Sequence, residues 1–211
     1  MKVIIKVQGL CKRFRNIEVL KDINITLESG HIYGIVGTNG SGKTMLLRAI
    51  SGLVVPSEGH ILIDDKILHK DIDFPTEMGI LIEKPEFLKN LTGFENLKML
   101  AEIKSKISDD TIRDYMEKFG LDSKTKKTVR KYSLGMRQKL GIIQAIMEEQ
   151  KLLILDEPFN GLDEGTVEFL RNLLIQYKRE GRLIIITSHH KEDIDAVCDY
   201  TYKIVEGKIA K

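Results

Sequence analysis

The chain has 211 residues, which is enough for one large domain, or one domain with an insertion, around a sizeable core. Hydrophobic residues make up 42% and charged residues 30%, and a net charge of +2 is too small to indicate nucleic-acid binding by itself. No apolar run approaches the roughly 18 residues that a membrane-spanning helix needs, so we expect any membrane role to go through a partner.

The ends and the cysteines point to a cytoplasmic protein. Residues 1–7 are too short and too polar a start for a signal peptide. Cys11 and Cys198 lack the spacing of a metal site, so we expect free thiols in a reducing compartment.

The first elements in chain order are strands. Residues 2–7 and 19–27 alternate between apolar and polar side chains, and a short apolar run covers 31–36. Between the first two strands Phe14 lies among basic residues. Phe14 could stack on an adenine ring. The local pattern alone, however, favours a position of Phe14 in the core, with the neighbouring basic side chains exposed to solvent.

A glycine-rich segment follows the third strand and opens a helix at 45–50. Its glycines let the backbone wrap a phosphate, and the helix N-terminus adds positive charge at the same place. The lysine would reach the terminal phosphates and the threonine hydroxyl would hold Mg²⁺. The segment consists of Gly37, Thr38, Asn39, Gly40, Ser41, Gly42, Lys43 and Thr44.

The middle of the chain changes from strands to helices. Short strands are predicted at 61–63 and 78–82, and the second ends at Glu83, where open α/β sheets place ligands. From about 88 to 150 the periodicity is helical, with caps expected at Thr92, Ser108 and Ser133. The lysine-rich stretch 124–131 is interpreted as a solvated loop.

Four consecutive apolar residues, 152–155, predict a strand buried on both faces, with Asp156 and Glu157 at its carboxyl end. Two adjacent carboxylates there are costly unless a cation or a proton offsets them, so we assign Mg²⁺ to Asp156 and water activation to Glu157. A turn at 159–163 leads into an amphipathic helix, and Gly181 ends it.

The last buried strand, 183–186, runs into His189 and His190. Because neighbouring side chains of an extended segment point in opposite directions, we expect only one of the two to face the site. Residues 202–205 and 208–210 predict a closing hairpin. The element order favours an α/β fold with a three-layer core, an N-terminal β region and a helical insertion.

These motifs, in this order and over nearly all of residues 1–211, resemble the ATP-binding subunit of an ABC transporter. Residues 37–44 match Walker A of this P-loop NTPase family, 152–156 match Walker B, and 161–163 match the D-loop. The resemblance implies one ABC-ATPase domain with an N-terminal antiparallel β subdomain and a helical subdomain at about 88–150.

The same resemblance implies residue roles. It gives Glu157 the place of the catalytic glutamate and His189 that of the switch histidine, and it has Phe14 stack on adenine. Ser133 and Gly135 fall in the signature motif, which contacts the nucleotide of a second subunit. ATP and Mg²⁺ are the implied cofactors, with Thr44, Asp156 and Glu83 as the expected metal ligands.

Two departures from the family pattern are informative. The signature usually reads L-S-G-G-Q, whereas residues 132–136 read YSLGM, and Glu83 replaces the Q-loop glutamine. Both changes are similar to the ATPases of bacitracin-resistance and lantibiotic-immunity exporters. The resemblance therefore implies ATP hydrolysis that powers export of a peptide antibiotic or other drug-like substrate.

The implied partners are an integral-membrane permease and a second ATPase subunit, as a homodimer in the ATP-bound state, with no nucleic acid. The location would be the cytoplasmic face of the cell membrane, held there by the permease. The alternative hypothesis is an ABC ATPase that regulates a non-membrane partner. A small-molecule kinase shares only the phosphate-binding segment.

Overall fold

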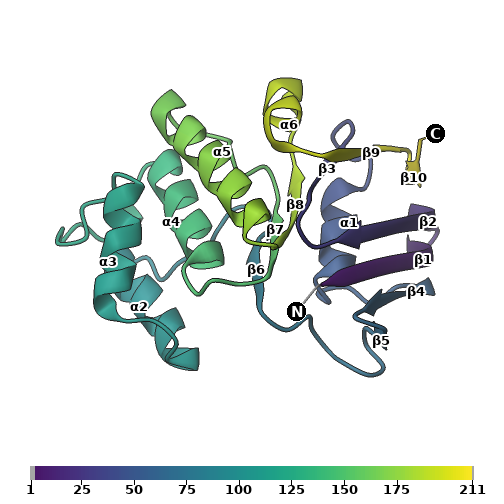
Figure 1. Cartoon of the computed structure of the whole chain (residues 1–211), viewed down its shortest axis with the longest axis horizontal. Helices are drawn as coiled ribbons and strands as arrows, with labels where there is room; N and C mark the ends of the chain where they lie inside the picture. The colour runs from purple at the N-terminus through teal and green to yellow at the C-terminus, as the bar shows by residue number, and fades with distance from the viewer. Residues whose placement is uncertain (1–2, 211) are drawn as a thin grey trace.

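The computed structural model describes residues 3–210, which form two sheets and the helices around them (Figure 1). The central sheet has the order β10-β9-β3-β8-β7-β6. Neighbours from β9 to β6 are parallel, and β10 pairs with β9 antiparallel. Its strands are β3 (Ile32–Val36), β6 (Met78–Leu81), β7 (Leu152–Leu155), β8 (Leu183–Thr187), β9 (Tyr200–Val205) and β10 (Lys208–Ile209).

The second sheet is antiparallel, with the order β2-β1-β4-β5. It contains β1 (Ile4–Phe14), β2 (Ile17–Glu28), β4 (Glu58–Ile63) and β5 (Lys66–Ile67). The antiparallel β region expected at the N-terminus is therefore present. Of the strand predicted at 2–7, Lys2 lies outside the described residues.

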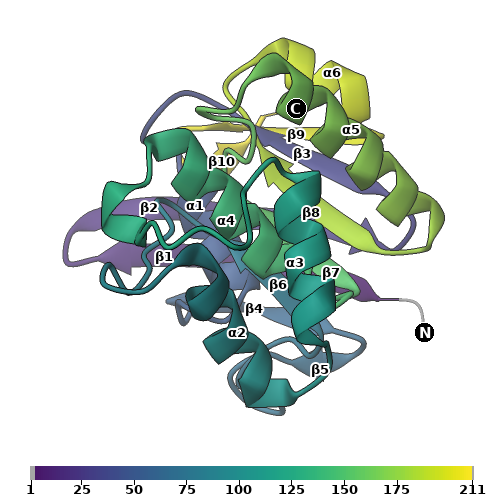
Figure 2. The ribbon, with the colours of Figure 1, turned by 90° about the vertical axis from the view of Figure 1, so that its left-hand side faces the viewer.

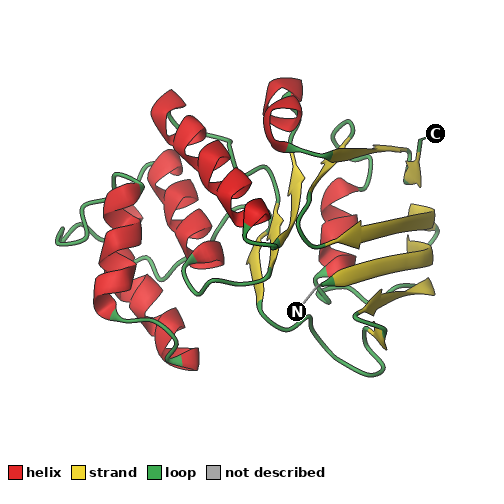
Figure 3. Ribbon diagram, viewed as in Figure 1, coloured by secondary structure: helices red, strands yellow, loops and turns green. Residues whose placement is uncertain are grey.

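The helices divide between the two faces of the central sheet. Figure 3 shows most helices gathered on one side and the antiparallel strands on the other. The helix α1 (Lys43–Ile50) lies between the two sheets (Figure 1). The opposite side carries α2 (Gly93–Lys104), α3 (Asp109–Lys118), the 3-10 turn Val129–Lys131, α4 (Leu134–Ile146) and α5 (Glu164–Arg179), and α6 (Lys191–Val197) follows β8 (Figure 2).

Each face of the central sheet has its own hydrophobic core. One joins α4 and α5 to the sheet, with Ile143, Leu153 and Leu174 fully buried. The other joins α1 to both sheets, with Leu47 and Ile154 fully buried. The all-buried pattern of β7 agrees with the strand predicted from four apolar residues in a row.

The caps expected at three helices are confirmed. Thr92 and Glu95 form a reciprocal capping box, and Ser108 and Ser133 each accept a hydrogen bond from the backbone three residues ahead. The basic residues of 124–131 are exposed, as predicted for a solvated loop.

Two features at the carboxyl end differ from the expectation. The predicted closing hairpin exists, but β9 also pairs in parallel with β3 and so belongs to the central sheet. The short helix α6 had not been predicted, because it has only seven residues and its N-cap, His190, makes no side-chain capping hydrogen bond. No helix among residues 3–210 is long and apolar enough to cross a membrane.

Candidate functional site

The candidate site lies where the carboxyl ends of four parallel strands meet. The segments that leave β3, β6, β7 and β8 there carry residues 37–42, Glu83, residues 156–157 and residues 188–190. A parallel sheet brings these ends to one edge, so residues far apart in the sequence become neighbours. A cavity of about 960 Å³ at this edge is lined by Gly37, Thr38, Glu157 and His189, among others.

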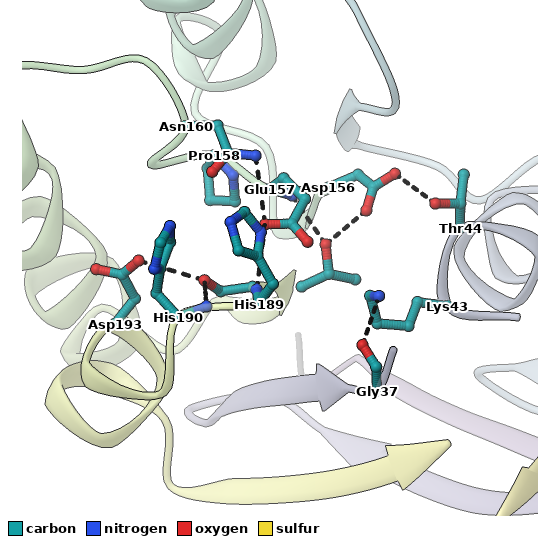
Figure 4. A network of polar contacts seen from close by, with 12 residues as sticks. Gly37, Lys43, Thr44, Asp156, Glu157, Pro158, Asn160, His189, His190 and Asp193 are labelled. Atoms are coloured by element: carbon teal, nitrogen blue, oxygen red, sulfur yellow. Dashed lines mark hydrogen bonds and ion pairs between the residues drawn. The ribbon is translucent and has the colours of Figure 1, made fainter. Parts of the chain in front are cut away.

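Residues 37–42 form a tight loop between β3 and α1. A side chain at Gly37 would place its Cβ 2.4 Å from the carbonyl oxygen of Ile204, so only glycine fits there. Lys43 is 7% exposed, and its ammonium contacts the carbonyl oxygens of Gly37 at 2.8 Å and Thr38 at 3.3 Å. The cation is thus held inside the loop that the sequence predicted to bind phosphate (Figure 4).

Thr44 and Asp156 come together across the site, as the metal prediction requires. The Thr44 hydroxyl donates to Asp156 Oδ2 at 2.8 Å (Figure 4). The Thr187 hydroxyl donates to Asp156 Oδ1. Asp156 is 6% exposed, so both carboxylate oxygens have a partner in a buried place.

This pair of oxygens fits an Mg²⁺ ion. Neighbouring ligands of an octahedral Mg²⁺ at about 2.1 Å lie about 3 Å apart, close to the separation of Thr44 Oγ1 and Asp156 Oδ2. Within residues 3–210 no cluster of three or more His, Cys, Asp and Glu side chains could hold a metal. An ion here would therefore need further oxygens, such as those of a phosphate.

The loop also fits a phosphate. Ser41 Oγ is buried and has no hydrogen-bond partner within the described chain. Thr38, Asn39 and Gly40 are exposed at the mouth of the loop. The loop thus brings together an unpaired buried hydroxyl, a buried cation and a helix N-terminus. An anion such as phosphate could interact favourably with all three.

Glu157 occupies a sharp turn after β7, with a φ of 49° in the left-handed region. Its backbone N–H donates to the Thr187 hydroxyl at 2.8 Å. Its carboxylate Oε2 lies 2.8 Å from His189 Nδ1 and 3.5 Å from Asn160 Nδ2 (Figure 4). The two residues that the sequence nominated for catalysis are therefore in direct contact.

The expected opposition of His189 and His190 is wrong. Their ring centroids lie 4.0 Å apart, so the rings contact each other (Figure 4). The reason is that β8 ends at Thr187, and the alternation of an extended strand does not continue beyond it. The expectation that only one of the two faces the site holds, since His189 contacts Glu157 and lines the cavity whereas His190 is the N-cap of α6.

Glu83 follows β6 and forms an ion pair that the sequence did not reveal. Its carboxylate lies 2.8 Å from the guanidinium of Arg48, one helical turn after Thr44 on α1. Glu83 also lines a cavity of about 700 Å³ with Asp156 and Glu157. The structure thus brings Glu83 to the edge of the site, with its charge compensated by Arg48.

Phe14 lies at the end of β1 and is 47% exposed. The interpretation as a core residue is therefore wrong. The Lys12 ammonium lies 4.9 Å from the centre of its ring. About half of the Phe14 side chain is thus exposed to solvent.

Ser133 and Gly135 lie at the start of α4. Ser133 is exposed, and its hydroxyl caps the helix through the N–H of Met136 at 3.2 Å. A Cβ at Gly135 would lie 2.5 Å from the carbonyl oxygen of Gly161, so α4 touches the turn after β7 backbone to backbone. Within this chain Ser133 contacts none of the residues 37–44 by hydrogen bond in the described part.

The same turn is fastened to α4 by two further residues. Lys139 Nζ lies 2.8 Å from Asp163 Oδ2, and this hydrogen bond, with those from Thr166, holds the pKa of Asp163 well below its usual range. Gln138 donates to the carbonyl oxygens of Glu157 and Pro158.

Sequence reasoning gave no role to Thr187, Gln138 or Arg48. Thr187 stands at the end of a buried strand, and a polar residue at that position is the signal that could have nominated it. Gln138 and Arg48 read as ordinary helical residues, because only the fold brings α4 and α1 to their partners.

Comparisons with known proteins agree with this geometry. The family model described as ABC transporter matches residues 20–160. The ABC transporter ATP-binding protein YybJ of Bacillus subtilis (strain 168) is 48% identical over 206 residues, covering 98% of this chain and 94% of that protein. The lantibiotic transport ATP-binding protein SrtF of Streptococcus pyogenes is 34% identical, covering 98% of this chain and 89% of its own length.

A further relative is the bacitracin transport ATP-binding protein BcrA of Enterococcus faecalis, 36% identical over 100% of this chain and 69% of its own. Among solved structures, an ATP-binding subunit of an ABC transporter superposes with a TM-score of 0.88 at 25% identity, covering 99% of this chain and 88% of that one. A bacterial ABC transporter cassette solved as a dimer has the same fold, with a TM-score of 0.88 at 21% identity over 98% of this chain and 97% of its own. By the family model, the relatives and the fold together, the chain belongs to the ABC transporter family of ATP-binding proteins.

Proposed function

We propose that this protein hydrolyses ATP to power an exporter of a peptide antibiotic or other drug-like substrate. The observation that carries the proposal is the placement of Glu157, which contacts His189 on one side of a cavity whose other side is the loop 37–42. A carboxylate facing a phosphate-binding loop at a sheet edge suits hydrolysis better than binding alone.

In this proposal ATP binds to residues 37–44, with its adenine on the exposed ring of Phe14. The Lys43 ammonium exchanges the carbonyl oxygens of Gly37 and Thr38 for phosphate oxygens. Thr44 and Asp156 hold Mg²⁺, with Glu83 as a third ligand once it leaves Arg48. When bound, Mg²⁺ neutralises charge on the phosphates.

Glu157 is the proposed general base. It accepts a proton from the attacking water while the water oxygen bonds to the γ-phosphorus and the bond to the bridging oxygen breaks, releasing ADP and phosphate. His189 fixes the Glu157 carboxylate through its Nδ1 and is placed to sense the γ-phosphate. The Thr187 hydroxyl forms hydrogen bonds with both the Asp156 carboxylate and the backbone N–H of Glu157. The same residue therefore positions the proposed metal ligand and the proposed base.

A second copy of the chain completes the site in this proposal. Ser133 and Gly135 lie at an exposed helix start that makes no hydrogen bond to the chain's own phosphate-binding loop in the described part. A helix N-terminus is an anion-binding group, and the phosphate of a partner subunit would use it. A bacterial cassette with the same fold was solved as a dimer, which supports the pairing of two copies in this proposal.

The membrane assignment rests on relatives named for lantibiotic and bacitracin transport. The proposal places the protein on the cytoplasmic face of the cell membrane through a permease. In it, residues 88–150 act as a helical subdomain within a single domain.

The variant Glu157→Gln tests the catalytic assignment. We expect ATP binding to be retained, hydrolysis to fall by about a hundredfold or more, and the ATP-bound dimer to accumulate. The matched control is Glu168→Gln, because Glu168 is an exposed glutamate on α5. Undiminished phosphate release by Glu157→Gln would remove Glu157 from the mechanism. Affinity capture that recovers a soluble complex instead of a polytopic membrane protein would favour the regulatory alternative.

A further inference from the structure

The side chain of Gln138 reaches from α4 to the turn that carries Glu157. Gln138 is 7% exposed, so its amide group is removed from water. Its Nε2 donates to the carbonyl oxygens of Glu157 at 3.1 Å and Pro158 at 3.2 Å. Both protons of one amide are thus directed at two successive carbonyl groups.

These carbonyl groups belong to a turn that does not hold its shape by local preference. Glu157 has a φ of 49°, which non-glycine residues rarely adopt. A backbone in this region persists when its surroundings fix it. The Thr187 hydroxyl fixes the N–H of Glu157, and Gln138 fixes its carbonyl oxygen.

The same helix contacts the turn at two flanking points. Gly135 lies against the carbonyl oxygen of Gly161, and Lys139 is paired with Asp163. One face of α4 therefore holds the whole segment 157–163, and Gln138 is the member of that face nearest to the catalytic residue.

We propose that Gln138 is a positioning residue for hydrolysis, because it orients the backbone from which the Glu157 carboxylate projects. The inference rests on the proposed function, in which Glu157 is the base. With the backbone fixed on both sides, the carboxylate is held where His189 Nδ1 contacts it at 2.8 Å. Without the amide, the turn can relax and the carboxylate leaves its working position.

The test is a comparison of Gln138→Leu and Gln138→Met with the wild type. Both variants remove the two hydrogen bonds at similar volume, and the unbranched methionine is the safer fit if leucine disturbs folding. We expect kcat to fall by about tenfold to a hundredfold, with KM and the affinity for ATP unchanged. Gln144→Leu is the matched control, since Gln144 lies half-buried on the same helix and away from the turn.

A double mutant separates positioning from general loss of structure. In a Glu157→Gln background, Gln138→Leu should slow hydrolysis no further, because the residue through which it acts is already disabled. An equal additional loss in that background would overturn the inference. So would an unchanged kcat, a rise in KM alone, or unfolding of both Gln138 variants in a thermal melt. Failure of the proposed function would instead show in Glu157→Gln itself.

Discussion

The phosphate-binding loop and the start of α4 are built in opposite ways, although in the proposed mechanism both hold one nucleotide. In the loop, Lys43 is buried against the carbonyl oxygens of Gly37 and Thr38, and the Thr44 hydroxyl is bonded to Asp156. At the start of α4, Ser133 is exposed and the neighbouring Leu134 is 57% exposed.

An apolar side chain left this open at an exposed helix start is typical of a surface that is covered in another state. The loop is formed entirely by residues of this chain, whereas the start of α4 is an exposed surface for which this chain provides no binding partner. The comparison teaches that, in the proposed mechanism, nucleotide binding and nucleotide-dependent assembly depend on different parts of the chain. The following variants are designed to affect one without the other.

The largest effect is expected from Lys43→Met, which removes the cation of the loop and keeps most of the side-chain volume. Losing charge-assisted bonds to phosphate should weaken ATP binding by about 30-fold or more. Equilibrium binding of a fluorescent ATP analogue measures this, with Lys70→Met as the control at an exposed loop position. Retained affinity in Lys43→Met would mean that the ammonium keeps its carbonyl partners when nucleotide is bound.

A smaller effect, confined to assembly, is expected from Ser133→Asp. Aspartate still caps α4, so the stability of the monomer should hold, but its charge repels a phosphate brought by a second subunit. We expect ATP affinity to be unchanged and ATP-dependent dimerisation to weaken at least about tenfold by light scattering.

Ser108→Asp makes the same change at the cap of α3 and is the control. Normal dimerisation by Ser133→Asp would show that the start of α4 does not face the nucleotide of the partner.

The smallest effect is expected at Arg48, which compensates the charge of Glu83. Arg48→Gln frees the carboxylate, and because exposed ion pairs are weak, the Mg²⁺ concentration for half-maximal nucleotide binding should fall only about threefold. Glu83→Gln should raise that concentration, and the double variant should resemble Glu83→Gln alone. An Arg48 effect that persists without Glu83 would contradict a shared metal site.

The fold was largely predictable where local signals are strong. Four apolar residues at 152–155 and the caps Thr92, Ser108 and Ser133 predict their elements because burial and capping act within a few residues. The pairing of β9 with β3 could not be predicted, because it joins residues more than 160 positions apart in the sequence. The helix α6 lacks a side-chain cap and is only seven residues long, so it gave no comparable signal.

The residues of the candidate site also differ in how far the sequence could predict them. Residues 37–44, Asp156 and Glu157 could be nominated because they follow apolar strands directly, and strand ends meet at one edge of a parallel sheet. Gln138 and Arg48 could not be nominated, because nothing in the pattern of α4 or α1 indicates the partners that the fold brings to them. The opposition expected of His189 and His190 was wrong for a related reason, as the strand ends before them.

The packing of α4 against β6 has a mechanical consequence. A Cβ at Gly79 would lie 1.7 Å from the carbonyl oxygen of Ala145, and one at Gly141 would lie 2.8 Å from the ring of Pro85. Neither glycine has a side chain, and the ring of Pro85 is rigid, so a force applied to the segment after Glu83 would pass to α4 with little absorbed by a change of rotamer. The helix would then act as a stiff lever, and the residue that caps its first turn is Ser133.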